Sequence, residues 1–183
     1  MRIIAGTRKG KKLFTPKNDN VRPTTDRTRE AIYSILFARL EKEFSQYKVL
    51  DIFAGTGAFG LEALSRGAKE VCFVDLDLSL AKKNVDLCGF LNVSFIRSDA
   101  RKIGKARSYF DLVFMDAPYN KGLTEPVLEN LFNKGYLSVD TLLIVEVEKN
   151  EDIVLDARFT LIDERVYGVS KVLFLKIANA HNE

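Results

Sequence analysis

The chain has 183 residues, of which 46% are hydrophobic, and a formal net charge of +3, which is the composition of a single globular domain. No apolar run approaches the ~20 residues that a membrane-spanning helix needs, and the first residues lack the apolar core of a signal peptide. The two cysteines fit neither a disulfide framework nor a zinc site, and the lone His181 lies in a polar tail. We therefore expect a cytoplasmic protein with no metal and no catalytic histidine.

Positive charge is concentrated at the N-terminus. Residues 1–30 contain nine Lys or Arg against three Asp or Glu, a net charge of +6, whereas the remainder of the chain is −3. A basic end on a mildly acidic body is typical of an arm that binds a polyanion such as RNA or DNA. A solvated terminus is the simpler interpretation, but the clustering favours nucleic acid. The candidate contacts are Arg8, Lys9, Lys11 and Lys12.

The N-terminal residues predict a small hairpin and then a helix. Residues 1–5 and 13–15 can form two short strands around a basic, glycine-containing turn. The segment around Pro23 should be extended, because proline disfavours helical geometry at the residue before it. A helix should then begin with Thr25 or Asp26 as its N-cap, because apolar residues repeat at helical spacing beyond it. These apolar residues are Ala31, Ile32, Ile35, Leu36 and Leu40.

From residue 48 onward, strand and helix patterns alternate. The expected strands are 49–53, 70–75, 93–97, 112–115, 142–147, and a C-terminal antiparallel hairpin of 159–166 and 171–177; the expected helices are 57–65, 79–88, 99–103 and 124–134. This order predicts an α/β, Rossmann-like fold with a mostly parallel sheet and helices on both of its faces. We expect one domain, with residues 1–24 as a basic RNA-binding extension and residues 25–183 as the core.

The segment 49–60, VLDIFAGTGAFG, has the pattern of a strand, a glycine turn and a helix start. Such a turn binds a cofactor, because glycine lets the ligand approach the backbone and the helix N-terminus offers unpaired N–H groups. The Gly-x-Gly-x-x-Gly spacing also matches a dinucleotide site. Asp51 lies four residues before the first of these glycines, however, and an ionised carboxylate there would repel a pyrophosphate and suit a cationic amine. We therefore expect S-adenosylmethionine rather than a nicotinamide cofactor, bound by Asp51, Ala54, Gly55 and Gly57.

Polar residues also follow the next strands. The carboxyl ends of parallel strands form the ligand-binding edge of such a sheet, so Asp75 should accept hydrogen bonds from ribose hydroxyls. Asp99 could accept the exocyclic amine of adenine, while the Ala100 N–H meets a ring nitrogen. For Asp99 taken alone, a helix-capping role is an almost equally good interpretation.

The tetrapeptide Asp116-Ala117-Pro118-Tyr119 follows the apolar strand 112–115. Its carboxylate and carbonyls can accept hydrogen bonds from an aromatic amine, which turns the nitrogen lone pair out of conjugation and toward a methyl donor. Pro118 stiffens the loop, and Tyr119 can stack on a base, a contact worth roughly 1–3 kcal/mol. A plain proline turn is the alternative for the tetrapeptide in isolation. The candidate catalytic residues are Asp116, Pro118 and Tyr119.

These motifs resemble those of known methyltransferases. Residues 49–57 resemble motif I of class I S-adenosylmethionine-dependent methyltransferases, and residues 116–119 resemble the Asn/Asp-Pro-Pro-Tyr/Phe motif of amino-group methyltransferases. The segments MRIIAG at 1–6, RPTTDRTREA at 22–31 and LEALSRGA at 61–68 resemble the bacterial 16S rRNA guanine-N2 methyltransferases that act on guanine 966. The resemblance covers nearly the whole chain, and the N-terminal signature is its most specific part.

The resemblance implies methyl transfer to the N2 amine of a guanine in 16S rRNA, in the small ribosomal subunit or an assembly intermediate. It implies that the N-terminal hairpin contacts rRNA and that residues 22–25 lie over the cofactor site, so Arg22 and Thr24 join the cofactor-binding candidates. The chain departs from the family at Ala117, where the family has a proline. This departure lowers the rigidity of the loop, but the acceptor and stacking residues are retained.

Two other functions are compatible with the residues. One is a non-catalytic RNA-binding assembly factor that keeps a methyltransferase fold, which the alanine in the acceptor loop supports. The other is a DNA amino-methyltransferase, which the small size of the chain disfavours because no room is left for a target-recognition domain. In each case we expect a monomer.

Overall fold

The computed structural model describes residues 1–16 and 25–178. The chain forms two compact units, Met1–Arg97 and Ser98–Glu183, and each is described by itself. Within the described residues, no helix is long and apolar enough to cross a membrane. The expected single domain with a basic extension stays a prediction.

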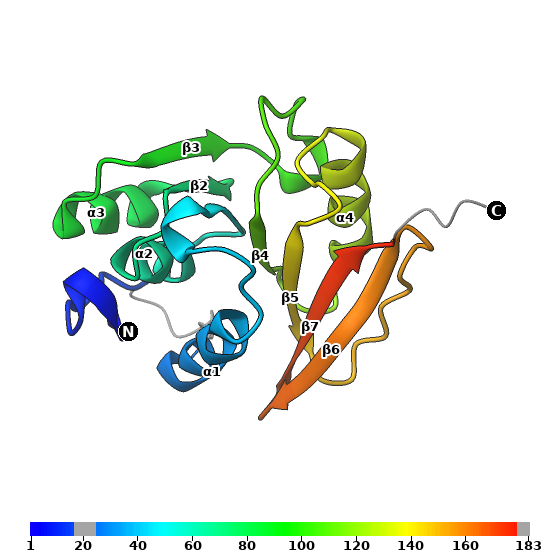
Figure 1. Cartoon of the computed structure of the whole chain (residues 1–183), viewed down its shortest axis with the longest axis horizontal. Coiled ribbons are helices and arrows are strands. Elements are labelled where there is room, and N and C mark those ends of the chain that lie inside the picture. The colour runs from blue at the N-terminus through cyan, green and yellow to red at the C-terminus, as the bar shows by residue number, and fades with distance from the viewer. Residues whose placement is uncertain (17–24, 179–183) are drawn as a thin grey trace. The chain divides into compact units, whose positions relative to one another are not determined.

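The first unit contains a parallel sheet with the strand order β3-β2-β1. Figure 1 labels β2 and β3 of this sheet together with the helices of the same unit. Its strands are β1 (Lys48–Ile52), β2 (Glu70–Asp75) and β3 (Val93–Arg97); its helices are α1 (Asp26–Phe37), α2 (Ala58–Ser65) and α3 (Ser79–Cys88), with the 3-10 turns η1 (Gly6–Arg8) and η2 (Phe44–Gln46). β1 and β2 are short apolar runs with buried interiors, as expected for central parallel strands.

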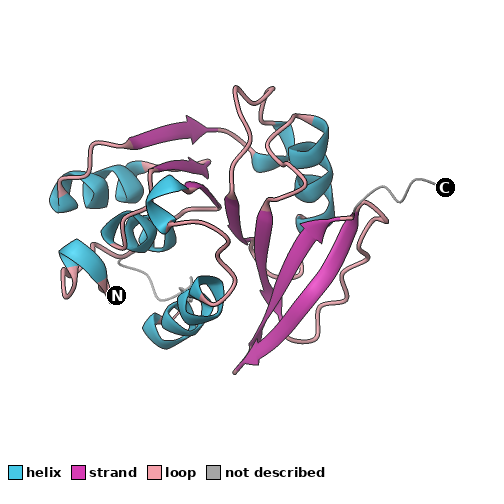
Figure 2. Cartoon of the chain, viewed as in Figure 1, coloured by secondary structure: helices cyan, strands magenta, loops and turns pink. Residues whose placement is uncertain are grey.

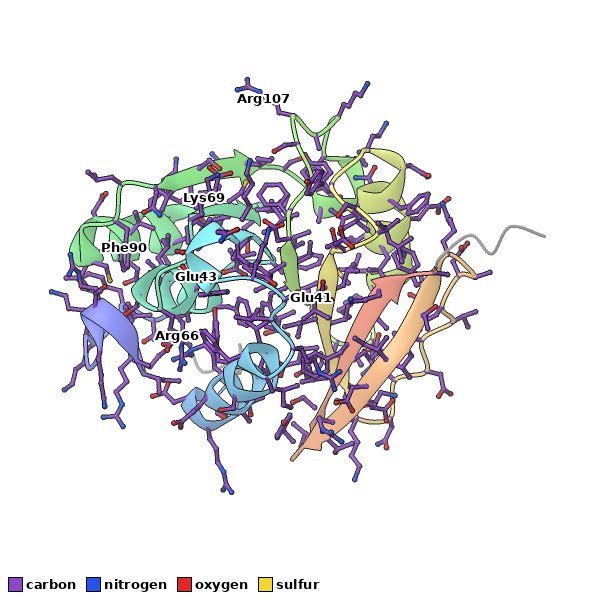
Figure 3. The ribbon with its side chains drawn as sticks, viewed as in Figure 1. Glu41, Glu43, Arg66, Lys69, Phe90 and Arg107 are labelled. Atoms are coloured by element: carbon purple, nitrogen blue, oxygen red, sulfur yellow. The ribbon has the colours of Figure 1, made fainter. Side chains whose placement is uncertain are left out.

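All residues of α2 are buried, so this helix lies at the centre of the first unit. Tyr33 of α1 stacks on Phe59 of α2 with 4.9 Å between ring centroids, and its hydroxyl donates to the Phe59 carbonyl at 2.8 Å. Arg66, labelled in Figure 3 at the end of α2, extends toward α1 and places its guanidinium 4.6 Å from the Tyr33 ring. The helix that begins at the glycine turn is therefore held by its neighbours along its whole length.

The N-terminal residues form the predicted hairpin, but only a short part of its two arms is paired. The Ile3 N–H donates to the Lys11 carbonyl at 3.0 Å, and the Gly10 N–H donates to the Ile3 carbonyl at 2.8 Å. A single antiparallel bridge joins Arg2 and Lys12. The arms do not extend into full strands, because the next backbone groups bond to side chains of the core instead.

Glu62 of α2 fixes the first arm of the hairpin. Its carboxylate is fully buried and accepts the N–H groups of Ile4 at 2.7 Å and Ala5 at 3.0 Å. Gly6 follows with φ at +79°, and a Cβ there would lie 1.8 Å from the Ser65 carbonyl oxygen. Only glycine fits at this point, because the hairpin backbone passes directly against the end of α2.

Asn84 of α3 fixes the second arm and connects it to the glycine turn. Its Oδ1 accepts the Phe14 N–H at 2.7 Å, and its Nδ2 donates to the Phe14 carbonyl at 3.0 Å and to the Thr56 carbonyl at 2.9 Å. Asn84 is fully buried. One amide side chain thus joins the basic hairpin to the turn that follows β1.

The second unit contains a mixed sheet with the strand order β4-β5-β7-β6. Its strands are β4 (Leu112–Asp116), β5 (Leu142–Glu148), β6 (Phe159–Tyr167) and β7 (Ser170–Ile177), with the helix α4 (Thr124–Asn133) and the 3-10 turn η3 (Ala100–Lys102). β4 and β5 are parallel, and β7 pairs antiparallel with both β5 and β6. Figure 2 shows β6 and β7 as a long hairpin, which confirms the C-terminal hairpin predicted from the sequence.

Most element bounds agree with the sequence predictions to within one residue, and the larger or conformationally distinct differences are as follows. α1 ends at Phe37, where the Arg39 N–H bonds to the Leu36 carbonyl in a tighter turn, so Leu40 lies outside the helix. Phe53, expected at the end of β1, has left the strand with φ at 59°. The short helix expected at 99–103 is the three-residue turn η3, because Asp99 caps it and only a single turn follows.

Candidate active site

The turn between β1 and α2 has the geometry expected of a cofactor-binding turn. The Ala54 N–H bonds to the Val74 carbonyl at 3.1 Å, which ties the turn to β2. Gly57, the N-cap of α2, has φ at +75°, and a Cβ there would lie 3.2 Å from the Phe73 ring and 3.3 Å from the Ala81 Cβ. Gly57 has no side chain to cap this helix, and the helix start is a site at which backbone N–H groups and the helix dipole favour a polar ligand.

Asp51 is buried beneath this turn. Only 2% of the residue is exposed, and its Oδ2 accepts the Gly60 N–H at 2.9 Å. Burial raises the pKa of Asp51 to about 8; Asp75 adds to the rise, while the Gly60 N–H and Arg29 oppose it. At neutral pH the carboxyl is therefore mostly protonated. The repulsion of a pyrophosphate, on which the sequence-based choice of cofactor depended, consequently applies only above this pKa.

Asp75 ends β2 and connects the strand to the glycine turn. Its Oδ2 accepts the Gly55 N–H at 2.8 Å, and its Oδ1 accepts the Asp77 N–H at 3.1 Å. A carboxylate oxygen can accept a second hydrogen bond, so this arrangement is compatible with ribose hydroxyls as further donors. Asp51 and Asp75 thus both bond to the segment 55–60, and their predicted contacts with the cofactor stay a prediction.

Asp99 and Ala100 belong to the second unit, at the start of η3. Asp99 accepts the Arg101 N–H at 3.0 Å and forms an ion pair of 2.6 Å with the Arg101 guanidinium. The hydrogen bonds from Arg101 lower the pKa of Asp99 to about 2. Asp99 therefore acts as the N-cap of η3, and its hydrogen bond to adenine stays a prediction. Ala100 is buried, and its carbonyl accepts a hydrogen bond from the Asn130 amide at 3.1 Å.

The predicted acceptor loop begins at Asp116, the last residue of β4. Ala117 is buried, Pro118 is exposed and Tyr119 is half-buried. The Tyr119 hydroxyl donates to Glu146 Oε1 of β5 at 3.2 Å. Glu146 was not among the residues predicted for the site, although an acidic residue within an apolar strand is a detectable signal.

The loop backbone is anchored just beyond Tyr119. Asn120 has φ at 54°, and its N–H donates to the Glu151 carboxylate at 3.2 Å. The acceptor loop is thus fixed at the tyrosine hydroxyl and at the following amide, and both acceptors are glutamates from or just after β5.

The basic hairpin presents Lys9, Lys11 and Lys12 as exposed side chains. Arg8 differs from them, because its Nε donates to the Cys88 carbonyl at 2.7 Å and its guanidinium lies 5.5 Å from the Phe90 ring. Phe90 is labelled in Figure 3 just after α3. Arg8 therefore holds the hairpin turn against α3, and the three lysines are the cations free of such an anchor.

A cavity of about 460 Å³ lies beside the hairpin. Two cations that were not predicted as RNA contacts, Arg2 and Arg27, line this cavity. Its lining residues are Arg2, Ile3, Ile4, Lys9, Gly10, Asp26, Arg27 and Glu30. Arg22 and Thr24, predicted to lie over the cofactor, are outside the described residues. Within residues 1–16 and 25–178, no group of three or more His, Cys, Asp or Glu could hold a metal ion.

The family model described as "Conserved hypothetical protein 95" matches residues 1–176. The chain belongs to this family. A relative from Haemophilus influenzae, named ribosomal RNA small subunit methyltransferase D, is 34% identical over 177 residues, which span 92% of this chain and 90% of the relative. The Escherichia coli K12 protein of the same name is also 34% identical, over 92% of this chain and 85% of its own length.

A solved structure from Escherichia coli, described there as a proposed methyltransferase, matches with a TM-score of 0.81 and 31% identity, covering 97% of each chain. The fold expected from the sequence, that of the class I methyltransferases, is therefore confirmed. The resemblance to the small-subunit rRNA methyltransferases is confirmed as well, since the family and the curated relatives agree along nearly the whole chain. Membership of this family implies a methyl donor.

Proposed function

We propose that this protein transfers a methyl group from S-adenosylmethionine to the N2 amine of a guanine in 16S rRNA, in the small ribosomal subunit or an assembly intermediate. Relatives at 33–34% identity are named small-subunit rRNA methyltransferases. The observation that carries the proposal is the acceptor loop, in which Asp116 ends a strand and Tyr119 is held at 3.2 Å by Glu146. We propose a cytoplasmic location on the same ground, because a ribosomal substrate would be found there.

The first unit has residues that fit the cofactor. The start of α2 and the glycines before it would bind the methionine end, and Asp75 would accept hydrogen bonds from the ribose hydroxyls. Asp51 accepts a hydrogen bond from the Gly60 N–H at this helix start, and it would also interact with the methionine amine. When bound, S-adenosylmethionine supplies an electrophilic methyl group.

Asp116 and Tyr119 would prepare the acceptor. The lone pair of guanine N2 is delocalised into the ring, so the planar amine is a poor nucleophile. Hydrogen bonds from N2–H to the Asp116 carboxylate and to a loop carbonyl favour a pyramidal nitrogen and stabilise the positive charge that develops on it. Stacking on Tyr119 orients the base. No strong base is required before attack, because the amine loses its proton after the bond to carbon forms.

The experiment that tests the function is methyl incorporation into 30S particles from a strain lacking the modification, combined with cofactor titration. The proposed enzyme binds S-adenosylmethionine and methylates one guanine N2 in these particles. Binding of RNA with no methyl transfer would favour the non-catalytic assembly factor, for which the buried Ala117 in the proline position is the supporting observation. Methylation of DNA but not of the particle would favour the DNA amino-methyltransferase.

Binding of the cofactor should release a proton from Asp51. The methionine amine is cationic, so it stabilises the ionised carboxylate and lowers a pKa that burial has raised to about 8. Calorimetry at pH 7 in buffers of different ionisation enthalpy should show more protons released by the wild type than by Asp51→Asn. The asparagine still accepts the Gly60 N–H, so the turn should persist. Equal proton release by both proteins would mean that Asp51 only supports the turn.

The same pKa has a consequence for stability in the absence of cofactor. A carboxyl whose pKa is about 8 in the folded state and 3.8 in the unfolded state binds more protons when folded. The free energy of unfolding of the wild type should therefore fall, relative to that of Asp51→Asn, as the pH rises from about 4 to 8. Chemical denaturation at several pH values measures this difference.

The hairpin lysines should supply RNA affinity. Changing Lys9, Lys11 and Lys12 together to Ala should weaken RNA binding and lower the slope of log K against log salt by about two to three units, since each phosphate contact contributes roughly one. Cofactor affinity should not change. Three exposed lysines of the second unit, Lys105, Lys134 and Lys149, are the matched control. An unchanged slope in the hairpin variant would show that these lysines are only solvated.

A further inference from the structure

Glu146 is an acidic residue in an otherwise apolar strand. The rest of β5 from Leu142 to Val147 is aliphatic and buried, and Glu146 itself is only 3% exposed. Burial of a carboxylate is costly unless hydrogen bonds compensate it, and an aliphatic side chain would satisfy the packing of this strand. The fold therefore does not require a glutamate here, and the residue needs another explanation.

The contacts of Glu146 direct it toward the acceptor loop. Its Oε1 accepts the Tyr119 hydroxyl at 3.2 Å, and its register partner on the parallel strand β4 is Asp116. Register partners on neighbouring strands project to the same face of the sheet, so the Asp116 and Glu146 carboxylates lie on one face, next to the start of the acceptor loop. Burial, followed by the negative charges of Glu146 and Asp116, raises the pKa of Tyr119, while Ser170 opposes the rise. The tyrosine thus keeps its proton and remains the donor.

We propose that Glu146 is a positioning residue that orients the Tyr119 ring for stacking on the target base. This inference rests on the proposed function. The Asn120–Glu151 bond restrains the loop backbone, but it leaves the tyrosine side chain free to rotate about its own bonds. The bond from the hydroxyl to Glu146 fixes the far end of the ring. A ring held in the stacking orientation binds the base without a further loss of side-chain entropy.

A double-mutant cycle tests this role. Tyr119→Phe keeps the ring and removes the hydroxyl, and Glu146→Leu replaces the carboxylate by a residue typical of this strand. Each single variant should lower kcat/KM for 30S particles by about tenfold, mainly through a higher KM for the particle, as expected for loss of one hydrogen bond to a charged group. The double variant should be no worse than the poorer single variant, because both changes remove the same bond.

Three further measurements complete the test. Glu146→Gln should recover kcat/KM to within about threefold of wild type, because its amide oxygen still accepts the hydroxyl. S-adenosylmethionine affinity should be unchanged in every variant, which also verifies folding. Glu164→Leu, at an exposed position of β6, is the matched control and should behave as wild type.

Two results would overturn the positioning role while leaving the proposed function intact. One is additive losses in the double variant, which would mean that Glu146 does not act through Tyr119. The other is a wild-type KM for the particle in Glu146→Leu. A wild-type protein that binds the cofactor but methylates no RNA would instead overturn the proposed function itself.

Discussion

Asp116→Ala is expected to reduce methyl transfer to small-subunit particles by about 10²–10³, the typical effect of removing one preorganised group that stabilises charge in the transition state. The structure places this carboxylate at the end of β4, directly before the loop that Glu146 and Glu151 anchor. The loss should appear in kcat, because the positive charge on the amine develops only during the transfer. Single-turnover methyl incorporation measures it.

Two comparisons make this result specific. Asp116→Asn should retain part of the activity, because the amide oxygen accepts a hydrogen bond but carries no charge. Asp152→Ala, at an exposed position of the same unit, should have no effect. S-adenosylmethionine affinity should stay within a few-fold in all three variants. Near wild-type transfer by Asp116→Ala would disprove the mechanism and require another carboxylate as the acceptor.

Glu62→Ala is expected to destabilise the protein by about 3–5 kcal/mol, because it breaks a buried ion pair and removes the acceptor of two backbone N–H groups. Arg29 is 1% exposed, and its Nε lies 4.0 Å from Glu62 Oε2. Within the described residues, its Nε and Nη1 have no hydrogen-bond acceptor, whereas its Nη2 pairs with Asp26 at 3.0 Å, so Glu62 and Asp26 together offset the guanidinium charge. The same substitution removes the acceptor for the N–H groups of Ile4 and Ala5. Urea denaturation measures the loss of stability.

A surface glutamate provides the matched control for this prediction. Glu70 pairs with Lys48 at 3.1 Å, but both side chains are substantially exposed, so Glu70→Ala should change stability by about 0.2–1 kcal/mol. Hydrogen exchange should also be faster at Ile4 and Ala5 in Glu62→Ala than in Glu70→Ala. A loss of less than about 1 kcal/mol in Glu62→Ala would show that Asp26 and hydration suffice to compensate Arg29.

Strand positions and the order of the elements could be predicted from local patterns. The bounds of β2 and β3 agree with the sequence prediction, because β2 is a short apolar run between two acidic residues and β3 is rich in β-branched and aromatic residues. The glycine turn and the acceptor loop could likewise be placed at strand ends from the sequence. Their chemistry depends on particular residue types at short, fixed spacings along the chain, and such spacings can be recognised in the sequence.

The roles of Glu62 and Asn84 could not be predicted, because their partners are far away in the sequence. Each is a polar residue on a helix, and a polar residue on a helix usually faces solvent. Glu62 bonds to residues 58 and 57 positions earlier, and Asn84 bonds to Phe14, 70 positions earlier. Only the packing of the N-terminal hairpin on α2 and α3 buries these side chains and makes them structural.

The sequence by itself thus determined the fold class, the family and the residues at the glycine turn and the acceptor loop. The tertiary structure decided the electrostatics of those residues. Asp51 reads as an ionised carboxylate in the sequence, but burial raises its pKa to about 8. Glu146 reads as one more strand residue, but pairing of β5 with β4 sets it beside Asp116 and the Tyr119 hydroxyl. Charge and hydrogen bonding depend on distance and desolvation, and folding sets both of them.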